Sequence, residues 1–352
     1  MLTCRSGSAQ IHRMMLSRCL TKYVAACFLF AGVFAAVGAE KAPPSASNSG
    51  VQITQLTDRL RVEINGQLFT EYYFKDVPRP FCYPLLGPGS LPMMRNWPMK
   101  DVPGEDKDHP HHRSLWFTHG SVNGHDFWSE HKNFGKIVHD GFVEVASGKD
   151  VGVIKSRNKW VASDGTVICS DERTLRFYNR PATERLLDFE ITIHASNGEV
   201  TFGDTKEGTM AIRLNETMRL KPNKENAGRP TGHIVNSEGV RDDATWGKRA
   251  KWCDYYGPVE GRTVGVAIFD NPSNPRYPTW WHVRDYGLFA ANPFGRHDFE
   301  KLPDKTAGNL VVPAGGSVTF RYGVYMHEGD EQHGKVAARY ETYLKAAAKQ
   351  SK

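Results

Sequence analysis

The sequence predicts an all-β protein built as a large antiparallel β-sandwich, on the basis of three observations. Short runs of alternating apolar and polar residues recur from Val51 to Met326, as expected for strands with one buried face. Glycine, proline, asparagine or aspartate separate these runs at the spacing typical of sandwiches. A helical period with good helix formers occurs in "KVAARYETYLKAAAK", residues 335–349. We therefore expect a supersandwich of two sheets with a short C-terminal helix.

The clearest hairpin is predicted in "RLRVEINGQLFTEYYF", residues 59–74. Its apolar and charged residues alternate, and the run breaks at Asn65-Gly66, a pair favoured in type I′ turns. Further strands are predicted in "FVEVAS", "VGVIKSRNKWV", "TVICSDERTLRFY", "RLLDFEITIHAS", "GTMAIRL", "RTVGVAIFD", "YGLFAA" and "SVTFRYGVYM". The predicted sandwich domain spans residues 51–334, and the helix and tail span residues 335–352.

The first 39 residues are typical of a secretory signal peptide. Four cations and no acidic residue precede the apolar run "YVAACFLFAGVFAAVGAE". The small residues Val37 and Ala39 favour cleavage after Ala39. The string "VAAC" before Cys27 is similar to a lipoprotein cleavage box, but most of the apolar run follows it. Residues 40–50 are rich in proline and serine and predict a flexible linker. We therefore expect a periplasmic or secreted protein.

The composition argues against several classes of partner. The chain carries a net charge of +6, and loss of the four leader cations leaves +2, so nucleic acid and anionic lipid are not expected partners. Past the leader, no apolar stretch approaches the roughly 20 residues of a membrane helix, so no membrane insertion is expected after cleavage. Beyond the leader the cysteines are Cys82, Cys169 and Cys253, which fit either one disulfide and one thiol or three thiols.

Two long connections are predicted to form the walls of a site. Residues 85–114 and 269–299 contain proline or glycine every few positions, and the second stretch also contains five aromatic residues in its middle. Long segments without secondary structure in a compact domain are usually functional or disordered, and aromatic-rich, proline-stiffened segments favour function. We expect one cleft to be formed by the His109–Trp128 and Trp280–His297 segments.

The string "HPHHRSLW", residues 109–116, opens a stretch that holds half of the chain's 14 histidines. If this segment is extended, His109 and His111 face one way and His112 faces the other, because strand side chains alternate. His109 and His111 are then candidate ligands of one divalent metal ion or members of an anchoring network, while His112 points into the cleft. A metal site, a metal-free polar site and structural packing all remain compatible with this spacing, and no cofactor is required by the sequence.

The remaining candidates come from three motifs and the loops around them. "TWWHVRDYG" places His282 and Arg284 beside two tryptophans, a combination of polar and flat apolar groups that suits sugars. We assign acid and base roles to His112 and His282, and the carboxylate role to Glu207 of "GDTKEGTM", whose alternative is a solvated hairpin tip. Candidates for substrate binding are Arg113, His119, Asp126, Trp128, Trp281, Arg284 and Asn292. Asp126 and Trp128, in "VNGHDFWSE", have turn capping as their alternative role.

Several long motifs of the chain resemble a known family. The strings "RPFCYPLLGPGSLPMMRNWP", "GEDKDHPHHRSLWFTHGSVNGHDFW", "GDTKEGTMAIRL", "RTVGVAIFDNPSNPRYPTWWHVRDYGLFAANPFG" and "VVPAGGSVTFRYGVYMHEGD" are similar to the bacterial PmoA family, named methane oxygenase PmoA. The likeness covers residues 51–330. The name implies a metal-dependent oxygenase, but methane oxygenase subunits are embedded in membranes and no spanning segment is predicted here.

A weaker similarity is to the galactose-mutarotase-like supersandwich, in its strand pattern and its closing "PAGGSVTFRYGVY". That superfold includes epimerases, polysaccharide lyases and glycoside hydrolases, so the resemblance implies a small-molecule or oligosaccharide substrate. We therefore expect an exported carbohydrate-active enzyme, either an epimerase or isomerase or a lyase or hydrolase, that uses histidine and carboxylate acid–base chemistry. The alternative is a non-catalytic glycan-binding protein whose tryptophans stack on sugar rings.

Overall fold

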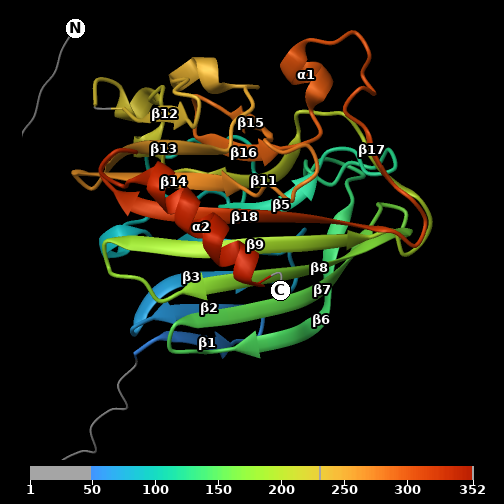
Figure 1. Cartoon of the computed structure of the whole chain (residues 1–352), viewed down its shortest axis with the longest axis horizontal. Coiled ribbons are helices and arrows are strands. Elements are labelled where there is room, and N and C mark those ends of the chain that lie inside the picture. Colours follow the sequence, from blue (N-terminus) through green and yellow to red (C-terminus); the bar gives the residue numbers. More distant parts are fainter. Residues whose placement is uncertain (1–48, 230, 351–352) are drawn as a thin grey trace, which may run out of the picture. The chain divides into compact units, whose positions relative to one another are not determined.

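Two large antiparallel sheets pack face to face in the computed structural model, which describes residues 49–229 and 231–350 (Figure 1). In the first sheet the strands are, in spatial order, β1 (Val51–Gln55), β2 (Arg59–Ile64), β3 (Gln67–Tyr73), β4 (Phe81–Leu85), β5 (Leu115–His119), β11 (Gly208–Arg213), β16 (Leu288–Asn292) and β15 (Trp280–Val283). In the second sheet they are β12 (His233–Asn236), β13 (Trp252–Val259), β14 (Arg262–Asp270), β18 (Ser317–Glu328), β9 (Glu184–His194), β8 (Val167–Tyr178), β7 (Val151–Val161) and β6 (Lys136–Ala146). The predicted all-β antiparallel sandwich is confirmed.

The remaining elements are short, apart from one helix. A small sheet pairs β10 (Val200–Phe202) with β17 (Leu310–Val312). The α-helices are α1 (Arg296–Glu300) and α2 (Val336–Gln350), and the 3₁₀ turns are η1 (Pro88–Ser90), η2 (Glu216–Met218), η3 (Lys224–Asn226) and η4 (Asp242–Thr245). The helix expected near the C-terminus is therefore present as α2.

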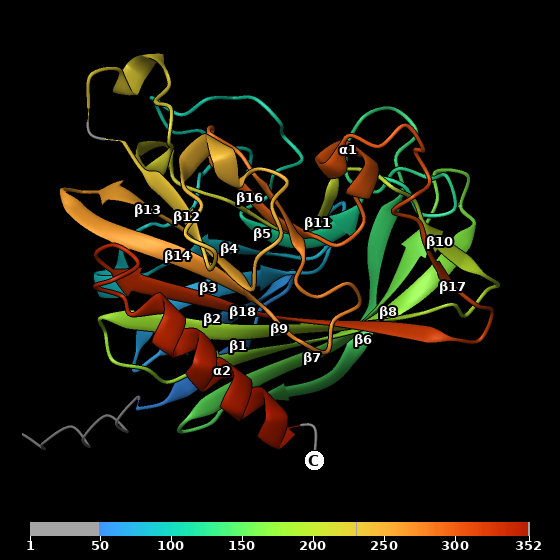
Figure 2. The same ribbon diagram turned by 45° about the horizontal axis from the view of Figure 1, so that its top comes forward.

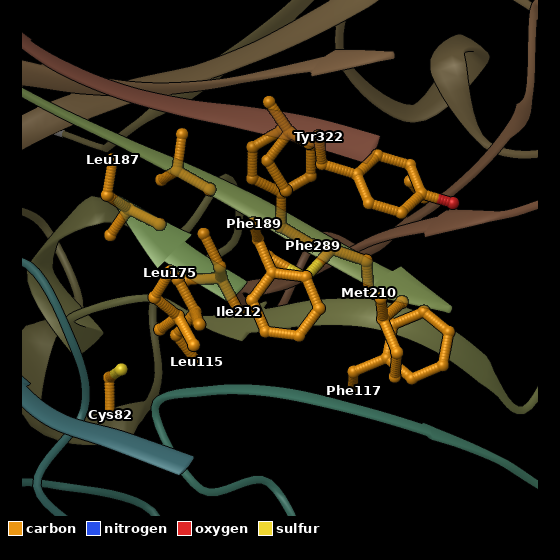
Figure 3. Close-up of a cluster of buried hydrophobic side chains, with 14 of the residues drawn as sticks. Cys82, Leu115, Phe117, Leu175, Leu187, Phe189, Met210, Ile212, Phe289 and Tyr322 are labelled. Carbon is orange, nitrogen blue, oxygen red and sulfur yellow. The ribbon is translucent and has the colours of Figure 1, made fainter. Parts of the chain in front are cut away.

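The hydrophobic core lies between the two large sheets. Alternation along β5 and β11 directs Leu115, Phe117, Met210 and Ile212 to the inner face of the first sheet. Figure 3 shows these side chains in one cluster with residues of β8 and β9, among them Phe189. Because the inner face of each sheet is buried in this way, functional side chains have to be sought on the outer faces.

The hairpin predicted at residues 59–74 is formed by β2 and β3. Asn65 and Gly66 have φ angles of 52° and 76°, which agree with the predicted type I′ turn. In contrast, the second predicted wall of the site, residues 269–299, is not loop-like throughout, because it contributes β15 and β16 to the first sheet. All nine residues of these strands are buried, so their sequences lack the polar alternation of a one-sided strand.

The outer face of the second sheet is partly covered by α2, which crosses it in Figure 2. Val336, Tyr340 and Tyr343 of this helix pack with Phe269 of β14 and Tyr325 of β18. The outer face of the first sheet carries a separate apolar cluster, formed by Phe81, Trp116, Trp128, Ala211, Leu288 and Ala290. The connections that contain the candidate site residues lie over this second cluster.

The predicted signal peptide and most of the linker, residues 1–48, lie outside the described residues. Among residues 49–229 and 231–350, no helix is long and apolar enough to cross a membrane. Cys82, Cys169 and Cys253 are all buried free thiols, so of the two predicted alternatives the structure has three thiols.

Candidate functional site

The outer face of the first sheet carries a row of side chains that joins the two predicted segments. Trp116 on β5 is paired with Ala211 on β11, Ala211 with Ala290 on β16, and Ala290 with His282 on β15. Paired residues of neighbouring strands point to the same face. Three strand spacings of about 4.8 Å separate Trp116 from His282, or roughly 14 Å. The His109–Trp128 and Trp280–His297 segments therefore meet on one face, as the sequence predicted.

The histidine segment forms a tight turn on this face. The backbone N–H of His112 donates to the carbonyl of His109 at 3.0 Å, which places Pro110 at the second position of a β-turn. The imidazole centroids of His109, His111 and His112 lie 4.5–5.6 Å from one another. His112 also stacks on Trp116, with ring centroids 5.4 Å apart. The three imidazoles thus form one cluster that continues the row of the sheet.

The predicted extended conformation, with His109 and His111 opposite His112, is therefore wrong. A proline favours an extended conformation in the residue before it, but its own fixed φ angle also suits the second position of a turn. His109, which starts the turn, has a positive φ of 42°. Because the three rings lie together, the structure does not separate the histidines into a metal-binding pair and one cleft-facing residue.

Two buried arginines hold the turn through Asp108. The carboxylate of Asp108 accepts from Arg95 and from Arg213, the second at 3.0 Å, and it also bonds Nδ1 of His109 at 2.7 Å. Burial opposes ionisation of Asp108, yet the hydrogen bond with His109 and the charges of Arg213 and Arg95 hold its pKa well below the usual range. Asp108 is therefore an anion at neutral pH.

A third buried arginine, Arg79, ties the turn to the loop that contains Trp128. Its Nη1 donates to the carbonyl of His111 at 3.1 Å and to Glu130 at 3.2 Å. Its Nη2 donates to the carbonyls of Phe127 and Trp128, both at 3.0 Å. One guanidinium thereby fixes two loops against each other, with Trp128 packed 5.7 Å from the ring of His112.

His112 and His282 are each bound at Nδ1 by an N–H donor. Nη1 of Arg213 lies 3.2 Å from Nδ1 of His112, and Nε1 of Trp246 donates to Nδ1 of His282 at 3.0 Å. Guanidinium and indole groups donate but do not accept, so Nδ1 of each imidazole must be the acceptor. The ring proton of each imidazole therefore resides on Nε2.

Neither histidine titrates near neutrality, contrary to the expectation for an acid and a base. Burial, followed by the charges of Arg284 and Lys206, lowers the pKa of His282 to about 3. Burial and then the charge of Arg213 hold the pKa of His112 well below its usual value. Both rings are neutral at neutral pH, and with Nδ1 occupied and Nε2 protonated neither has a free lone pair to accept a proton. The structure gives them the character of hydrogen-bond donors.

Three further charged or polar groups lie beside this row. Tyr286 stacks on His109 with centroids 5.3 Å apart, and the guanidinium of Arg284 lies 5.6 Å from the Tyr286 ring and 6.0 Å from the Trp246 ring. Burial first, and the charge of Glu207 among other causes, raises the pKa of Tyr286, so Glu207 lies within electrostatic reach of that phenol. A chain of contacts thus runs from the histidine turn through Tyr286, Arg284 and Trp246 to His282.

Two predicted substrate-binding residues face away from this surface. His119 is buried on the inner side of β5, where Nε2 bonds the carbonyl of Gly203 at 2.7 Å, and burial lowers its pKa to about 4. Trp281 lies in the core and donates from Nε1 to the carbonyl of Ala250 at 3.0 Å. The structure does not bring either residue to the outer face.

Three others have structural partners that occupy their polar groups. Asn292 donates to the carbonyls of Thr205 and Lys206 and accepts from two backbone N–H groups, so it anchors the loop before β11. Asp126 accepts from the backbone N–H groups of Trp128 and Ser129, which is the capping role kept as its alternative. Arg113 forms a two-point ion pair with Glu130 at 2.8 and 2.6 Å.

Residues absent from the predicted set complete the site. Arg213 and Trp246 fix the two imidazoles, Tyr286 links them, and Arg79 and Arg95 hold the turn. Tyr286 stands in the motif "WWHVRDYG" and was identifiable from its neighbours, whereas Trp246 has no motif around it. Within the described residues, no group of three or more histidine, cysteine or acidic side chains is arranged to hold a metal ion, so His109 and His111 are placed together without the further ligands of such a site.

Comparisons with known proteins identify a family and a fold. Residues 59–341 match the model of a family described as "Family of unknown function (DUF6807)", and this description does not carry the PmoA name. No curated protein matches the chain. Solved structures similar to the chain include a polysaccharide lyase (12% identity, 82% of this chain and 34% of that chain, TM-score 0.31). A protein named as a kojibiose phosphorylase, from the human microbiome, matches at 11% identity over 66% of this chain and 26% of that chain, with a TM-score of 0.26.

A third similar structure is a GalM/aldose epimerase homologue from C. elegans (8% identity, 80% of this chain and all of that chain, TM-score 0.29). The chain spans about a third and a quarter of the length of the lyase and the phosphorylase. At these identities and scores the three structures show what the fold is similar to and carry nothing about activity.

Proposed function

Because the chain belongs to the DUF6807 family, a family of unknown function, we propose its function from its own side chains: it is a carbohydrate-active enzyme whose substrate binds on the outer face of the first sheet. The observation that carries this proposal is the contact chain from His112 through Tyr286 and Arg284 to His282. It places flat aromatic faces beside fixed N–H donors on one surface. Sugars present apolar ring faces and hydroxyl groups, so they match such a surface.

In this proposal Glu207 carries out proton transfer. Its carboxylate is about two-fifths exposed and lies 3.2 Å from Nζ of Lys206, whereas the carboxylate of Asp108 in the turn is held by two arginines and His109. The hydroxyl of Tyr286 has no hydrogen-bond partner within residues 49–229 and 231–350, so it is a candidate for the opposite acid. A carboxylate and a phenol suit either an epimerase or isomerase or a lyase or hydrolase.

Turnover of sugars tests the enzyme proposal. The chain would be screened against neutral sugars, uronates, oxidised sugars and oligosaccharides, with Glu207→Gln, Tyr286→Phe and the matched surface variant Glu144→Gln, an exposed residue of β6. Loss of a positioned acid or base lowers the rate by roughly 10²- to 10⁴-fold, so we expect that loss in the first two variants and none in Glu144→Gln. Full rates in both site variants, or no turnover of any substrate, would contradict the proposal.

The alternative is a non-catalytic glycan-binding protein. It is favoured by one observation, namely that neither imidazole of the outer face titrates near neutrality. This alternative predicts sugar binding without turnover, with affinity that is sensitive to Tyr286→Ala and insensitive to Glu207→Gln. The same screen, run with calorimetry alongside product analysis, separates it from the enzyme.

We propose export of the protein on the basis of residues 1–39 alone. The four cations, the apolar run and the small residues before Glu40 support Sec-type cleavage and a periplasmic or secreted location. Amino-terminal sequencing of the protein recovered from its native compartment should begin near Glu40. Recovery of the uncleaved chain in the cytosolic fraction would contradict this.

A further inference from the structure

The two imidazoles at the ends of the outer face present hydrogen-bond donors and no acceptors. Nδ1 of His112 and of His282 is occupied by an N–H group of Arg213 and of Trp246, respectively. Nε2 of each ring has no hydrogen-bond partner among the described residues. Neither Nε2 atom is sealed from solvent. Each ring therefore offers one Nε2–H to a ligand, and that ligand must supply an acceptor.

Arg284 adds a positive charge that forms no ion pair with a carboxylate among the described residues. Lys206 is paired with Glu207 at 3.2 Å, and Arg213 with Asp108 at 3.0 Å. Asp285, the neighbour of Arg284 in sequence, is bound by Lys221 at 2.9 Å instead. Among the described residues, the guanidinium of Arg284 contacts the rings of Trp246 and Tyr286, and Arg284 is partly exposed.

His282 is in β15 and Arg284 directly follows the end of that strand at Val283. Both side chains contact Trp246, so they lie on the same side of the chain. They are two positions apart, and Val283 between them points into the core. Side chains two apart along an extended chain share a face, about 7 Å from one another. One partly exposed guanidinium and one imidazole N–H are thus close enough to donate to the two oxygens of a single group.

We propose that the outer face recognises an acidic sugar, whose carboxylate accepts hydrogen bonds from Nε2–H of His282 and from the guanidinium of Arg284. This inference rests on the proposed function, since it names the substrate class of the same site. A sugar hydroxyl both donates and accepts, whereas a carboxylate only accepts, so a pair of donors with one uncompensated charge matches the carboxylate better. His112, at the other end of the row, donates to an oxygen of the sugar unit that lies there.

The neutrality of His282 supports this assignment. Burial, then Arg284 and Lys206, lowers the pKa of the imidazole to about 3, so the ring keeps a single proton throughout the neutral range. The Trp246 indole holds that proton on Nε2 by occupying Nδ1. The donor is therefore preorganised and costs no tautomer change when the ligand binds.

Binding of matched ligand pairs to the full chain tests the substrate class. The probes are oligosaccharides of glucuronate, galacturonate and mannuronate, each beside its carboxyl-reduced counterpart, measured by calorimetry at low and high salt. We expect at least one acidic member to bind tenfold or more tightly than its reduced counterpart. A charge-assisted hydrogen bond is worth about 1.5–3 kcal/mol, so Arg284→Gln should weaken acidic-ligand binding about ten- to hundredfold and barely affect the reduced ligand.

Two variants serve as controls for the charge and for folding. Arg284→Lys keeps the positive charge but loses the planar guanidinium with its two parallel N–H donors, so it should give an intermediate affinity. Arg157→Gln removes an exposed cation of β7 on the other sheet and should leave affinity unchanged. Thermal unfolding of each variant shows whether the fold persists.

Nitrogen-15 NMR of the histidine rings gives a readout that a purely structural role would not move. His282 should show the Nε2–H tautomer and should not titrate between about pH 5 and 8. Trp246→Phe keeps an aromatic ring but removes the indole N–H, and it should release the tautomer preference and weaken binding of the acidic ligand. An Nδ1–H tautomer of His282 in the unaltered chain would overturn the inference.

The outcomes separate this inference from the proposed function. If the acidic and reduced members of each pair bind equally and Arg284→Gln changes neither, the site takes neutral sugars, which overturns the acidic substrate and leaves the carbohydrate proposal in place. If no member of any pair binds, both are overturned. Preference for the acidic member with the expected loss in Arg284→Gln supports both.

Discussion

Replacement of Arg79 by lysine should destabilise the protein by several kcal/mol. The guanidinium is fully buried, and its two terminal nitrogens donate to three backbone carbonyls, those of His111, Phe127 and Trp128, and to Glu130. A lysine ammonium keeps the charge but cannot replace the two terminal nitrogens of the planar guanidinium, so about two of the carbonyls lose their hydrogen-bond donor. An unsatisfied buried acceptor costs about 1–3 kcal/mol, which for two carbonyls predicts a loss of about 2–6 kcal/mol in the free energy of unfolding.

Arg113→Lys is the matched control, because Arg113 binds the same Glu130 but its guanidinium has no carbonyl partner within the described residues. The pair is mostly buried, with side-chain exposures of 19% for Arg113 and 12% for Glu130. Lysine keeps the charge and loses one of the two hydrogen bonds to the carboxylate, so the substitution should cost about 1 kcal/mol. Urea unfolding followed by tryptophan fluorescence measures both variants, and an unchanged m value shows that the denatured states are comparable. If Arg79→Lys costs no more than Arg113→Lys, the carbonyl contacts are not what joins the two loops.

Three further measurements test other parts of the structure. Burial opposes the charge of His327, but Asp254, at 3.0 Å, raises the pKa of His327 in the folded protein. The protonated imidazole therefore stabilises the fold fully at a pH below the pKa of histidine in the unfolded chain, and this stabilisation is lost as the pH rises through the raised folded-state pKa. His327→Gln should therefore cost more at about pH 5.5 than at about pH 9 in urea titrations, and equal costs would contradict this linkage. Tyr343→Ala on α2 should lower the free energy of unfolding by about 3–5 kcal/mol, because the ring packs against Phe269, and a loss under about 1 kcal/mol would mean that α2 is not tightly docked. Asn292→Ala removes two hydrogen bonds to the loop before β11 and two to the backbone that follows β16, and it should raise amide exchange of Lys206 and Glu207, which would stay protected if that loop were held by other groups.

The local parts of the fold were predictable from sequence. The turn at Asn65-Gly66 and the run of residues 151–161 give clear signals, because their conformation depends on near neighbours and one buried face. β15 and β16 were harder to assign, since both of their faces are covered and their side chains do not alternate in polarity. The sequence therefore showed the class of the fold better than the strand order.

The candidate site was predictable as a region but not in its details. The similar composition of the two connections correctly predicted that His112 and His282 lie on one face. The inward orientation of His119 could not be predicted, because β5 is buried on both sides and its side chains do not alternate in polarity. The turn at Pro110 is held in part by the ion pair between Asp108 and Arg213, which are 105 positions apart in the chain. No local pattern encodes such a contact, and the same holds for the indole of Trp246, 36 positions from the imidazole it fixes.

The position of β18 has a consequence for how the chain reaches its folded state. This strand begins at Ser317 and lies in the middle of the second sheet, between β9 and β14. The β6–β9 meander and the β12–β14 meander can each pair locally, yet they have no neighbouring strand in common until β18 arrives between them. During synthesis, both meanders therefore keep an unpaired edge strand until nearly the last segment of the chain has been made. A binding factor that shields strand edges would act on this protein in that interval, and a chain shortened before Ser317 would keep those edges exposed and aggregate.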